Sequence, residues 1–346
     1  MQFDTIKFKN NSLYLIDQRK LPGSIDFFQA DDYRDVVFAI VNMVVRGAPA
    51  IGAAAAYGVY LAAKEFSKLE KDIFLNKIKN SNQELKGARP TAVNLSWAVG
   101  RMELIINNNK EYSSDIIVEK IKKEADKILI EDIKTNKAMA AFGNIIVPEQ
   151  AVILTHCNTG ALATVDYGTA LGVIREAHNS GKKIKVYADE TRPRLQGARL
   201  TAFELVEEGI DAALIADSVA PTLIRDGKID LILVGADRIA ANGDTANKIG
   251  TYMLSEFAVK FNVPFYVVAP ISTIDFDIET GEEIEIEERS SREVSHIKEV
   301  QIAPENIDIY NPAFDVTPFK NITGIITEKG IIKAPYKQNI KKINKR

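Results

Sequence analysis

Residues 151–188 read AVILTHCNTGALATVDYGTALGVIREAHNSGKKIKVYA, and this stretch decides the fold class. It begins and ends with short apolar runs, at 151–154 and 184–188, and an amphipathic segment at 167–177 lies between them. Strands that are buried on both faces read as continuous apolar runs, and an intervening helix supplies the crossover of a parallel sheet. The stretch therefore predicts a strand–helix–strand unit.

The same alternation continues to the C-terminus. Residues 148–346 are therefore expected to form a doubly wound, Rossmann-like parallel α/β domain. Its further strands are expected at 212–215, 231–234 and 265–269, and its further helices at 197–207 and 248–260.

Residues 1–147 are expected to form a separate, mainly helical domain with a small β-hairpin, because a chain of 346 residues exceeds one compact core. From residue 31 to about 144, apolar residues recur at three- and four-residue steps. Helices are expected at 50–69, 91–107 and 114–142, and the hairpin from β-prone runs at 6–8 and 13–16 around Asn10-Asn11-Ser12.

Composition excludes several classes of protein. The net charge of -3 gives no basic field for nucleic acid. The longest uncharged stretch, 47–63, is too short for a comfortable membrane span and predicts a buried helix. The single cysteine, Cys157, permits no intramolecular disulfide, and with three scattered histidines it makes no Cys/His zinc site. We see no N-terminal signal segment and expect a reducing, cytoplasmic location and no metal.

Ligands of open parallel sheets bind outside the carboxyl ends of the strands, so the residues that follow each apolar run are the most informative. Cys157 follows the run at 151–154, and Asp237 follows the run at 231–234. A further polar turn, Asp189 to Arg192, follows the run at 184–188. We expect these turns to meet at one edge of the sheet.

By position alone, Cys157 is either a reactive thiol or a small buried structural residue. His156 would point away from it on an extended chain and is interpreted as structural. Asp237 follows a fully apolar strand, and such a setting raises a carboxyl pKa so that the group can act as a general acid. The alternative for Asp237 is a helix cap or an ion pair with Arg238.

Three expected helix starts carry groups that can bind an anion. Arg46-Gly47-Ala48-Pro49 places an arginine beside the free N–H groups of a first helical turn. Arg89 precedes a second helix, and Asn247 and Lys248 begin a third. Each alone is commonly a capped helix with a surface cation, but together they predict a site for an anionic small molecule.

The chain carries seven blocks that resemble the methylthioribose-1-phosphate isomerase family. This family belongs to a superfamily with ribose-1,5-bisphosphate isomerases and the regulatory subunits of a translation-initiation exchange factor. The blocks span nearly the whole chain: RGAPAIG at 46–52, GARPTAVNLSWA at 87–98, LTHCNTGALAT at 154–164, YGTALGVIREA at 167–177, ADETRPRLQGARLTAFEL at 188–205, GADRIAANGDTANKIGTY at 235–252 and IEERSSREV at 286–294.

The resemblance implies that Cys157 and Asp237 are the catalytic pair, with Asp237 as the proton donor. It implies that substrate binds at Arg46, Gly47, Ala48, Arg89, Gln196, Asn247 and Lys248. It also implies a homodimer and an aldose–ketose isomerisation of 5-methylthioribose 1-phosphate that needs no cofactor. Arg194 adds a cation near this set, so 5-deoxyribose 1-phosphate and ribose 1,5-bisphosphate remain alternative substrates. A non-catalytic subunit that senses a sugar phosphate or nucleotide remains the alternative of another class.

Overall fold

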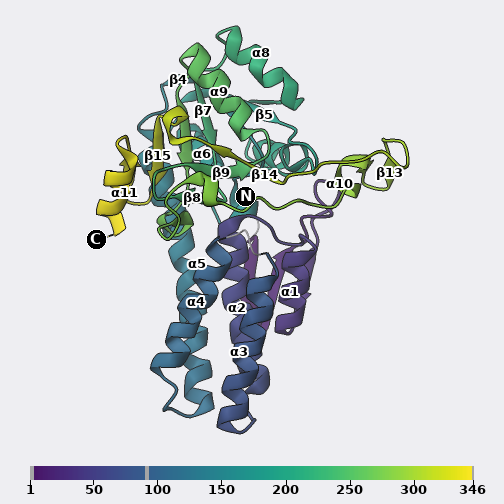
Figure 1. Cartoon of the computed structure of the whole chain (residues 1–346), viewed down its shortest axis with the longest axis vertical. Coiled ribbons are helices and arrows are strands. Elements are labelled where there is room, and N and C mark those ends of the chain that lie inside the picture. Colours follow the sequence, from purple (N-terminus) through teal and green to yellow (C-terminus); the bar gives the residue numbers. More distant parts are fainter. Residues whose placement is uncertain (1–3, 90–92, 345–346) are drawn as a thin grey trace. The chain divides into compact units, whose positions relative to one another are not determined.

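The computed structural model of the chain, drawn in Figure 1, describes residues 4–89 and 93–344. By internal packing the chain divides into two compact units, residues 1–136 with 161–168 and residues 137–160 with 169–346. Helix α5 (Ser114–Asn144) begins in the first unit and ends in the second. The domain boundary between residues 147 and 148, which rests on the change in composition, stays a prediction.

The first unit opens with an antiparallel three-stranded sheet of order β1-β2-β3. Asn10 and Asn11 both have positive φ, 51° and 64°, and close a tight turn of the kind that joins two hairpin strands. The predicted hairpin is confirmed. The third strand was not predicted, because it is short and alternates weakly. The strands are β1 (Ile6–Lys9), β2 (Ser12–Ile16) and β3 (Phe27–Ala30).

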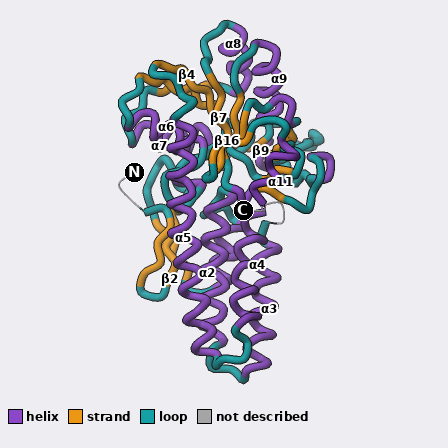
Figure 2. The backbone as a smooth tube through the Cα atoms, turned by 90° about the vertical axis from the view of Figure 1, so that its left-hand side faces the viewer, coloured by secondary structure: helices purple, strands orange, loops and turns teal. Residues whose placement is uncertain are grey.

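The rest of the first unit, where it is described, is mainly helical, as predicted. Helix α2 packs against α1, α3 and α4, and Figure 2 shows α2, α3 and α4 running side by side. Its alanines and glycines allow close approach: a Cβ on Gly52 would lie 2.9 Å from the Asn94 carbonyl oxygen of α4. The helices are α1 (Tyr33–Val41), α2 (Ala48–Phe66), α3 (Lys71–Gly87), α4 (Val93–Asn108) and the first part of α5.

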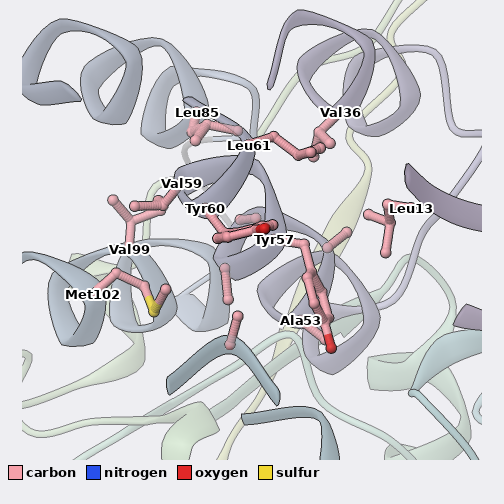
Figure 3. Packing of buried hydrophobic residues seen from close by; sticks show 14 of the residues in the cluster. Leu13, Val36, Ala53, Tyr57, Val59, Tyr60, Leu61, Leu85, Val99 and Met102 are labelled. Atoms are coloured by element: carbon pink, nitrogen blue, oxygen red, sulfur yellow. The ribbon is translucent and has the colours of Figure 1, made fainter. Parts of the chain in front are cut away.

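Helix α2 is buried from Ala50 to Ala63, which confirms the buried helix expected at 47–63. Figure 3 shows its side chains Tyr57 and Tyr60 in the core, among residues from the neighbouring helices and β2. Among the described residues, no helix has the length and apolar character needed to cross a bilayer. Thr91, the first residue of the helix expected at 91–107, lies outside the described residues.

The second unit is built on a seven-stranded sheet of order β16-β15-β10-β7-β4-β5-β6, in which every pairing except β15 with β16 is parallel. The predicted α/β class is confirmed, and the expected strands appear within one or two residues. They are β4 (Gln150–Thr155), β5 (Lys183–Asp189), β6 (Ala212–Ile215), β7 (Leu231–Val234) and β10 (Phe265–Val268). The other two strands of the sheet, β15 (Gly324–Thr327) and β16 (Gly330–Ile332), were not predicted.

Successive strand residues enter two different cores. In β7, Ile232 and Val234 join the core formed with α8, α9 and α11, whereas Leu231 and Leu233 join the core formed with α6. Because side chains alternate between the faces of a sheet, the unbroken apolar runs are explained by helices on both faces. The helices are α6 (Ala170–Asn179), α7 (Ala202–Glu207), α8 (Ala220–Arg225), α9 (Thr251–Phe261) and α11 (Tyr336–Asn344).

A second sheet, of order β11-β8-β9-β14, was not predicted. Its outer strand β14 comes from a segment more than sixty residues after β9, so local pattern does not reveal the pairing. The strands are β8 (Arg238–Ala240), β9 (Thr245–Lys248), β11 (Ile274–Asp275) and β14 (Phe314–Thr317); α10 (Arg292–Ser295) and the hairpin of β12 (His296–Ile297) and β13 (Val300–Gln301) lie between β11 and β14 in the chain.

Candidate active site

Cys157 and Asp237 follow two neighbouring strands. Strand β4 pairs in parallel with β7, and Thr155, the last residue of β4, lies opposite Leu233. Cys157 comes two residues after β4, and Asp237 three residues after β7. Both side chains are half-buried. Strand β5 lies on the other side of β4, so all three polar turns leave the same edge of the sheet, as expected.

The backbone at Cys157 is held in a left-handed conformation, with φ of 63°. This conformation is uncommon for a residue other than glycine and needs support from its surroundings. Two threonine hydroxyls supply it: the Cys157 N–H donates to Thr191 Oγ1 at 2.8 Å, and Thr201 Oγ1 donates to the Cys157 carbonyl oxygen at 2.6 Å. The thiol is therefore carried by a fixed turn rather than by an extended strand.

His156 is fully buried beside Cys157. Its Nδ1 lies 2.8 Å from Asp189 Oδ2, and its Nε2 lies 2.8 Å from the Ile249 carbonyl oxygen. Burial by itself lowers the pKa of His156, but the hydrogen bond and charge of Asp189, with Asp217 nearby, raise it above its ordinary value. Burial also raises the pKa of Asp189. The hydrogen bond between Nδ1 and Oδ2 therefore holds its proton more firmly than an isolated histidine does.

Ligand atoms of His156, Asp189 and Asp217 lie within 4.8 Å of one another, which is the spacing of a metal site. Hydrogen bonds engage most of the cluster, but Asp189 Oδ1 has no hydrogen-bond partner among the described residues. Asp217 accepts from the backbone N–H groups of Thr191 and Arg192, each at 2.7 Å, and both ring nitrogens of His156 have partners. The cluster joins the turns after β4 and β5.

Asp237 precedes a strand, β8, and not a helix, so the helix-cap alternative for it is wrong. Its N–H donates to the Ala246 carbonyl oxygen at 2.9 Å, which ties the turn after β7 to β9. Arg238 forms an ion pair with Asp275 at 3.5 Å.

Asn247 and Lys248 lie in strand β9, and the prediction that they begin a helix is wrong. The helix α9 starts at Thr251, after a sharp turn at Gly250 with φ of 103°. The pairing of β9 with β14 makes these residues a strand. Lys248 is buried, donates to the Ala313 carbonyl oxygen at 2.8 Å and lies 4.5 Å from the centre of the Phe314 ring.

Gln196 ends the turn after β5 and is buried. Within the described part of the chain, its side-chain oxygen Oε1 has no hydrogen-bond partner. Buried polar atoms are usually paired, so the unpaired oxygen of Gln196 is available to accept a hydrogen bond from a ligand. The π-helical turn Gly197–Thr201 that follows is set by close packing, because a Cβ on Gly197 would lie 1.6 Å from the Asp189 carbonyl oxygen.

Arg46, Gly47, Ala48 and Arg89 lie in the first unit. The predicted helix start is confirmed: Gly47 precedes α2 with φ of 95°, and Ala48 is the first helical residue. Gly47 packs on the backbone of Ala163, whose carbonyl oxygen would lie 2.3 Å from an added Cβ. Arg46 is buried. Arg89 follows α3, and the residues that join it to α4 lie outside the described ranges.

Comparison with known proteins identifies the family. Residues 44–334 match the Initiation factor 2 subunit family. The methylthioribose-1-phosphate isomerase of Thermoanaerobacter sp. (strain X514) is 70% identical over 342 residues, which cover 99% of each chain. The crystal structure of 5-methylthioribose 1-phosphate isomerase from Pyrococcus horikoshii OT3 is 46% identical, with a TM-score of 0.90 over 99% of this chain and 96% of that one. The chain belongs to the methylthioribose-1-phosphate isomerase family.

This isomerase family shares its fold with translation factors. The structure of translation initiation factor eIF-2B subunit delta from A. fulgidus is 42% identical and matches with a TM-score of 0.86 over 100% of both chains. The resemblance read from the sequence blocks is confirmed at the level of family and fold. Fold similarity alone does not separate an isomerase from a factor subunit, so the residues of the site carry the distinction.

Sequence reasoning placed the turn from Asp189 to Arg192 near Cys157 but did not identify the residues that hold Cys157 in place in this member of the isomerase family. Thr191, Thr201 and Asp189 are all fully buried or nearly so, and each bonds to the 156–157 segment. Asp189 had a usable signal, because a carboxylate directly after an apolar strand needs a partner when buried. The two threonines had none, since their contacts join segments more than thirty residues apart.

Proposed function

We propose that this chain converts 5-methylthioribose 1-phosphate to 5-methylthioribulose 1-phosphate, with Cys157 and Asp237 as the reacting pair. The reaction class follows from membership in the isomerase family. One observation carries the assignment of residues: both side chains leave the carboxyl ends of adjacent parallel strands, β4 and β7. The half-buried thiol on its fixed turn and the half-buried carboxyl are therefore presented at one edge of the sheet.

The phosphate on the anomeric oxygen prevents ordinary ring opening through a free hydroxyl. In the proposed reaction, Asp237 donates a proton to the ring oxygen as the bond from that oxygen to C1 breaks. A hydrogen then moves from C2 to C1, and the C2 hydroxyl loses its proton to become the carbonyl, so Asp237 can be reprotonated. Oxidation at C2 and reduction at C1 balance within one molecule. General acid–base catalysis of this kind typically increases the reaction rate by about 10²–10⁴-fold.

Two routes for the hydrogen differ in the role of Cys157. As a thiolate, Cys157 can remove the C2 proton and return it to C1; otherwise the hydrogen crosses as hydride and Cys157 shapes the site around it. The reaction in deuterated water separates the routes. Solvent deuterium at C1 of the product identifies proton transfer, whereas complete retention identifies hydride migration or a base shielded from solvent.

The residues proposed to bind the phosphate and hydroxyls are Arg46, Gly47, Ala48, Arg89, Gln196, Asn247 and Lys248. The buried Lys248 ammonium, next to Asn247, offers a charge that is poorly solvated. The unpaired Gln196 oxygen offers an acceptor for a sugar hydroxyl. Gly47 precedes the first turn of α2, whose leading backbone N–H groups have no acceptor within the helix.

The charge around Arg194 favours an uncharged group at C5 of the sugar. Arg194 Nη1 donates to Glu293 Oε1 at 2.7 Å, and Arg289 bonds to the same carboxylate and to Glu287. A second phosphate, as in ribose 1,5-bisphosphate, would need a free cation. Because two carboxylates already balance these two arginines, methylthio and deoxy substituents fit better.

A regulatory subunit is the second candidate, since the A. fulgidus relative at 42% identity carries a translation-factor name. A turnover assay decides between the two. We expect kcat/KM to be highest for 5-methylthioribose 1-phosphate, next for 5-deoxyribose 1-phosphate and lowest for ribose 1,5-bisphosphate. Absence of turnover on all three sugars would favour the regulatory role. We also propose that the chain forms a homodimer in the cytoplasm, where its only cysteine stays reduced.

A further inference from the structure

His156 joins two segments that the proposed reaction uses separately. On one side it is covalently next to Cys157 and bonded to Asp189 at the end of β5. On the other side its Nε2 lies 2.8 Å from the carbonyl oxygen of Ile249, the residue after Lys248. The ring and the Asp189 carboxylate are both fully buried. A buried ring with partners on both nitrogens has one orientation.

The segment that contains Ile249 continues into a turn at Gly250, which His156 contacts closely. Gly250 has φ of 103°, and a Cβ there would lie 3.0 Å from His156 Cε1. Asp315 also holds this turn, accepting from the N–H groups of Gly250 at 2.7 Å and Tyr252 at 3.0 Å. Asp315 also lies opposite Asn247 in the pairing of β14 with β9. The turn is thus held by both an imidazole and a carboxylate.

We propose that His156 is a positioning residue that holds the segment of Asn247 and Lys248 in register with the thiol of Cys157. This inference rests on the proposed function, since it assigns the phosphate to that segment. Through the Ile249 carbonyl, His156 sets where the ammonium of Lys248 lies relative to the turn after β4. Misplacement of a binding group by a fraction of an ångström weakens both binding and alignment.

The chemistry of the ring explains why a histidine stands here. The Ile249 carbonyl can only accept, so Nε2 carries a hydrogen, and Nδ1 shares a proton with Asp189. An asparagine or glutamine amide can replace only one of these two contacts. Three carboxylates act on the ring: Asp189 from β5, Asp217 from the turn before α8, and Asp315 from β14. Their charges favour a ring that donates from both nitrogens.

Two substitutions separate the contacts. His156→Asn places an amide near the position of Nδ1 and keeps the Asp189 partner, but it loses Ile249. His156→Gln places an amide near the position of Nε2 and keeps Ile249, but it loses Asp189. If His156 positions the phosphate-binding segment, His156→Asn raises KM for the sugar phosphate about tenfold, the effect of one lost hydrogen bond, while His156→Gln keeps KM within about twofold.

A second measurement does not depend on turnover. Cys157 is the only cysteine, so its alkylation by iodoacetamide reports on this one site. We expect inorganic phosphate to slow alkylation of the unmodified protein. The phosphate concentration for half-protection should rise about tenfold in His156→Asn and stay within about twofold in His156→Gln. His178→Gln, at the C-terminal end of α6, is the matched control and should change neither quantity.

Gly250→Ala provides a test in which His156 itself is unchanged. It retains both hydrogen-bonding groups of the ring and displaces only the turn, and we expect it to raise the half-protection concentration as His156→Asn does. Equal losses in His156→Asn and His156→Gln, or no change in His156→Asn and Gly250→Ala, would overturn the inference. Full turnover by Cys157→Ala would instead overturn the proposed function, and this inference with it.

Discussion

The backbone N–H of Cys157 donates to the hydroxyl of Thr191 at 2.8 Å, and this bond joins the turns after two adjacent strands, β4 and β5. Both residues have left-handed backbone conformations, with φ of 63° and 64°. The Thr191 hydroxyl in turn donates to the Asp189 carbonyl oxygen at 3.0 Å. The position of the thiol therefore depends on a threonine thirty-four residues away in the chain.

Thr191→Val should lower kcat because valine removes the acceptor for the Cys157 N–H at nearly constant volume. We expect a loss of about tenfold, the effect of one buried hydrogen bond, and a changed rate of Cys157 alkylation. Thr191→Ser keeps the hydroxyl and serves as the control, with kcat within about threefold of the unmodified protein. Equal activity of the valine and serine variants would show that the bond does not position the thiol.

Cys157→Ala should leave a folded protein with turnover reduced by at least ~10²-fold. The side chain is half-buried at the sheet edge, so removing one sulfur atom opens no core cavity. Steady-state kinetics on 5-methylthioribose 1-phosphate measure the loss, and the thermal midpoint checks the fold. Turnover close to that of the unmodified protein would refute the assigned role of the thiol.

Asp237→Asn should likewise reduce turnover by at least ~10²-fold, because an amide cannot donate and recover a proton at the ring oxygen. Asparagine preserves shape, and the backbone bond from residue 237 to the Ala246 carbonyl remains. The KM should change less than kcat, since the proposed role lies in the reaction and not in binding. Asp275→Asn, which alters the neighbouring ion pair with Arg238, is the control.

Gly47→Ala should destabilise the first unit by about 1–3 kcal/mol, because residue 47 has φ of 95° and an added Cβ would lie 2.3 Å from the Ala163 carbonyl oxygen. Gly87→Ala is the matched control. It ends α3 with no atom within 4 Å of its added Cβ, so it should stabilise the protein by about 0.5–1 kcal/mol. Denaturant unfolding measures both changes; a neutral Gly47→Ala would contradict the close packing.

Asp132 should make stability depend on pH in the acid range. Burial raises the pKa of this carboxyl from 3.8 to about 7. The hydrogen bonds that it accepts from the Val165 N–H and the Asn136 amide act in the opposite direction and lower the pKa. Between these values the folded state keeps a proton that the unfolded state releases. The protonated Asp132 carboxyl therefore contributes its full share to the free energy of unfolding below about pH 4, and this share is lost as pH rises through 7.

The Asp132→Asn variant tests this assignment, because asparagine still accepts from the Val165 N–H but cannot titrate. Its free energy of unfolding should vary less between pH 4 and 7 than that of the unmodified protein, by up to about 1.4 kcal/mol per pH unit. Chemical denaturation at several pH values measures the slope. Parallel curves for the two proteins would show that Asp132 is ionised in the folded state.

Five strands of the parallel sheet, β4, β5, β6, β7 and β10, were predicted within one or two residues because their evidence is local. Leu231–Val234 is an unbroken apolar run with helices on both faces. A short run of this kind, in a chain that alternates strands with helices, indicates a buried strand. Asn247 and Lys248 were placed wrongly for the opposite reason. A polar stretch before a helix resembles a helix start, and only pairing with β14 makes it a strand.

The sequence by itself determined the α/β class, the helical first unit, the family and the turns that carry Cys157 and Asp237, because apolar periodicity and short motifs are properties of neighbouring residues. Only the tertiary structure decided that β4 and β7 are neighbours, and that Thr191 and His156 hold the thiol-bearing turn. These contacts join segments separated by tens of residues, and their hydrogen bonds form only when the sheet brings the strand ends together. Local pattern carries no information on that arrangement.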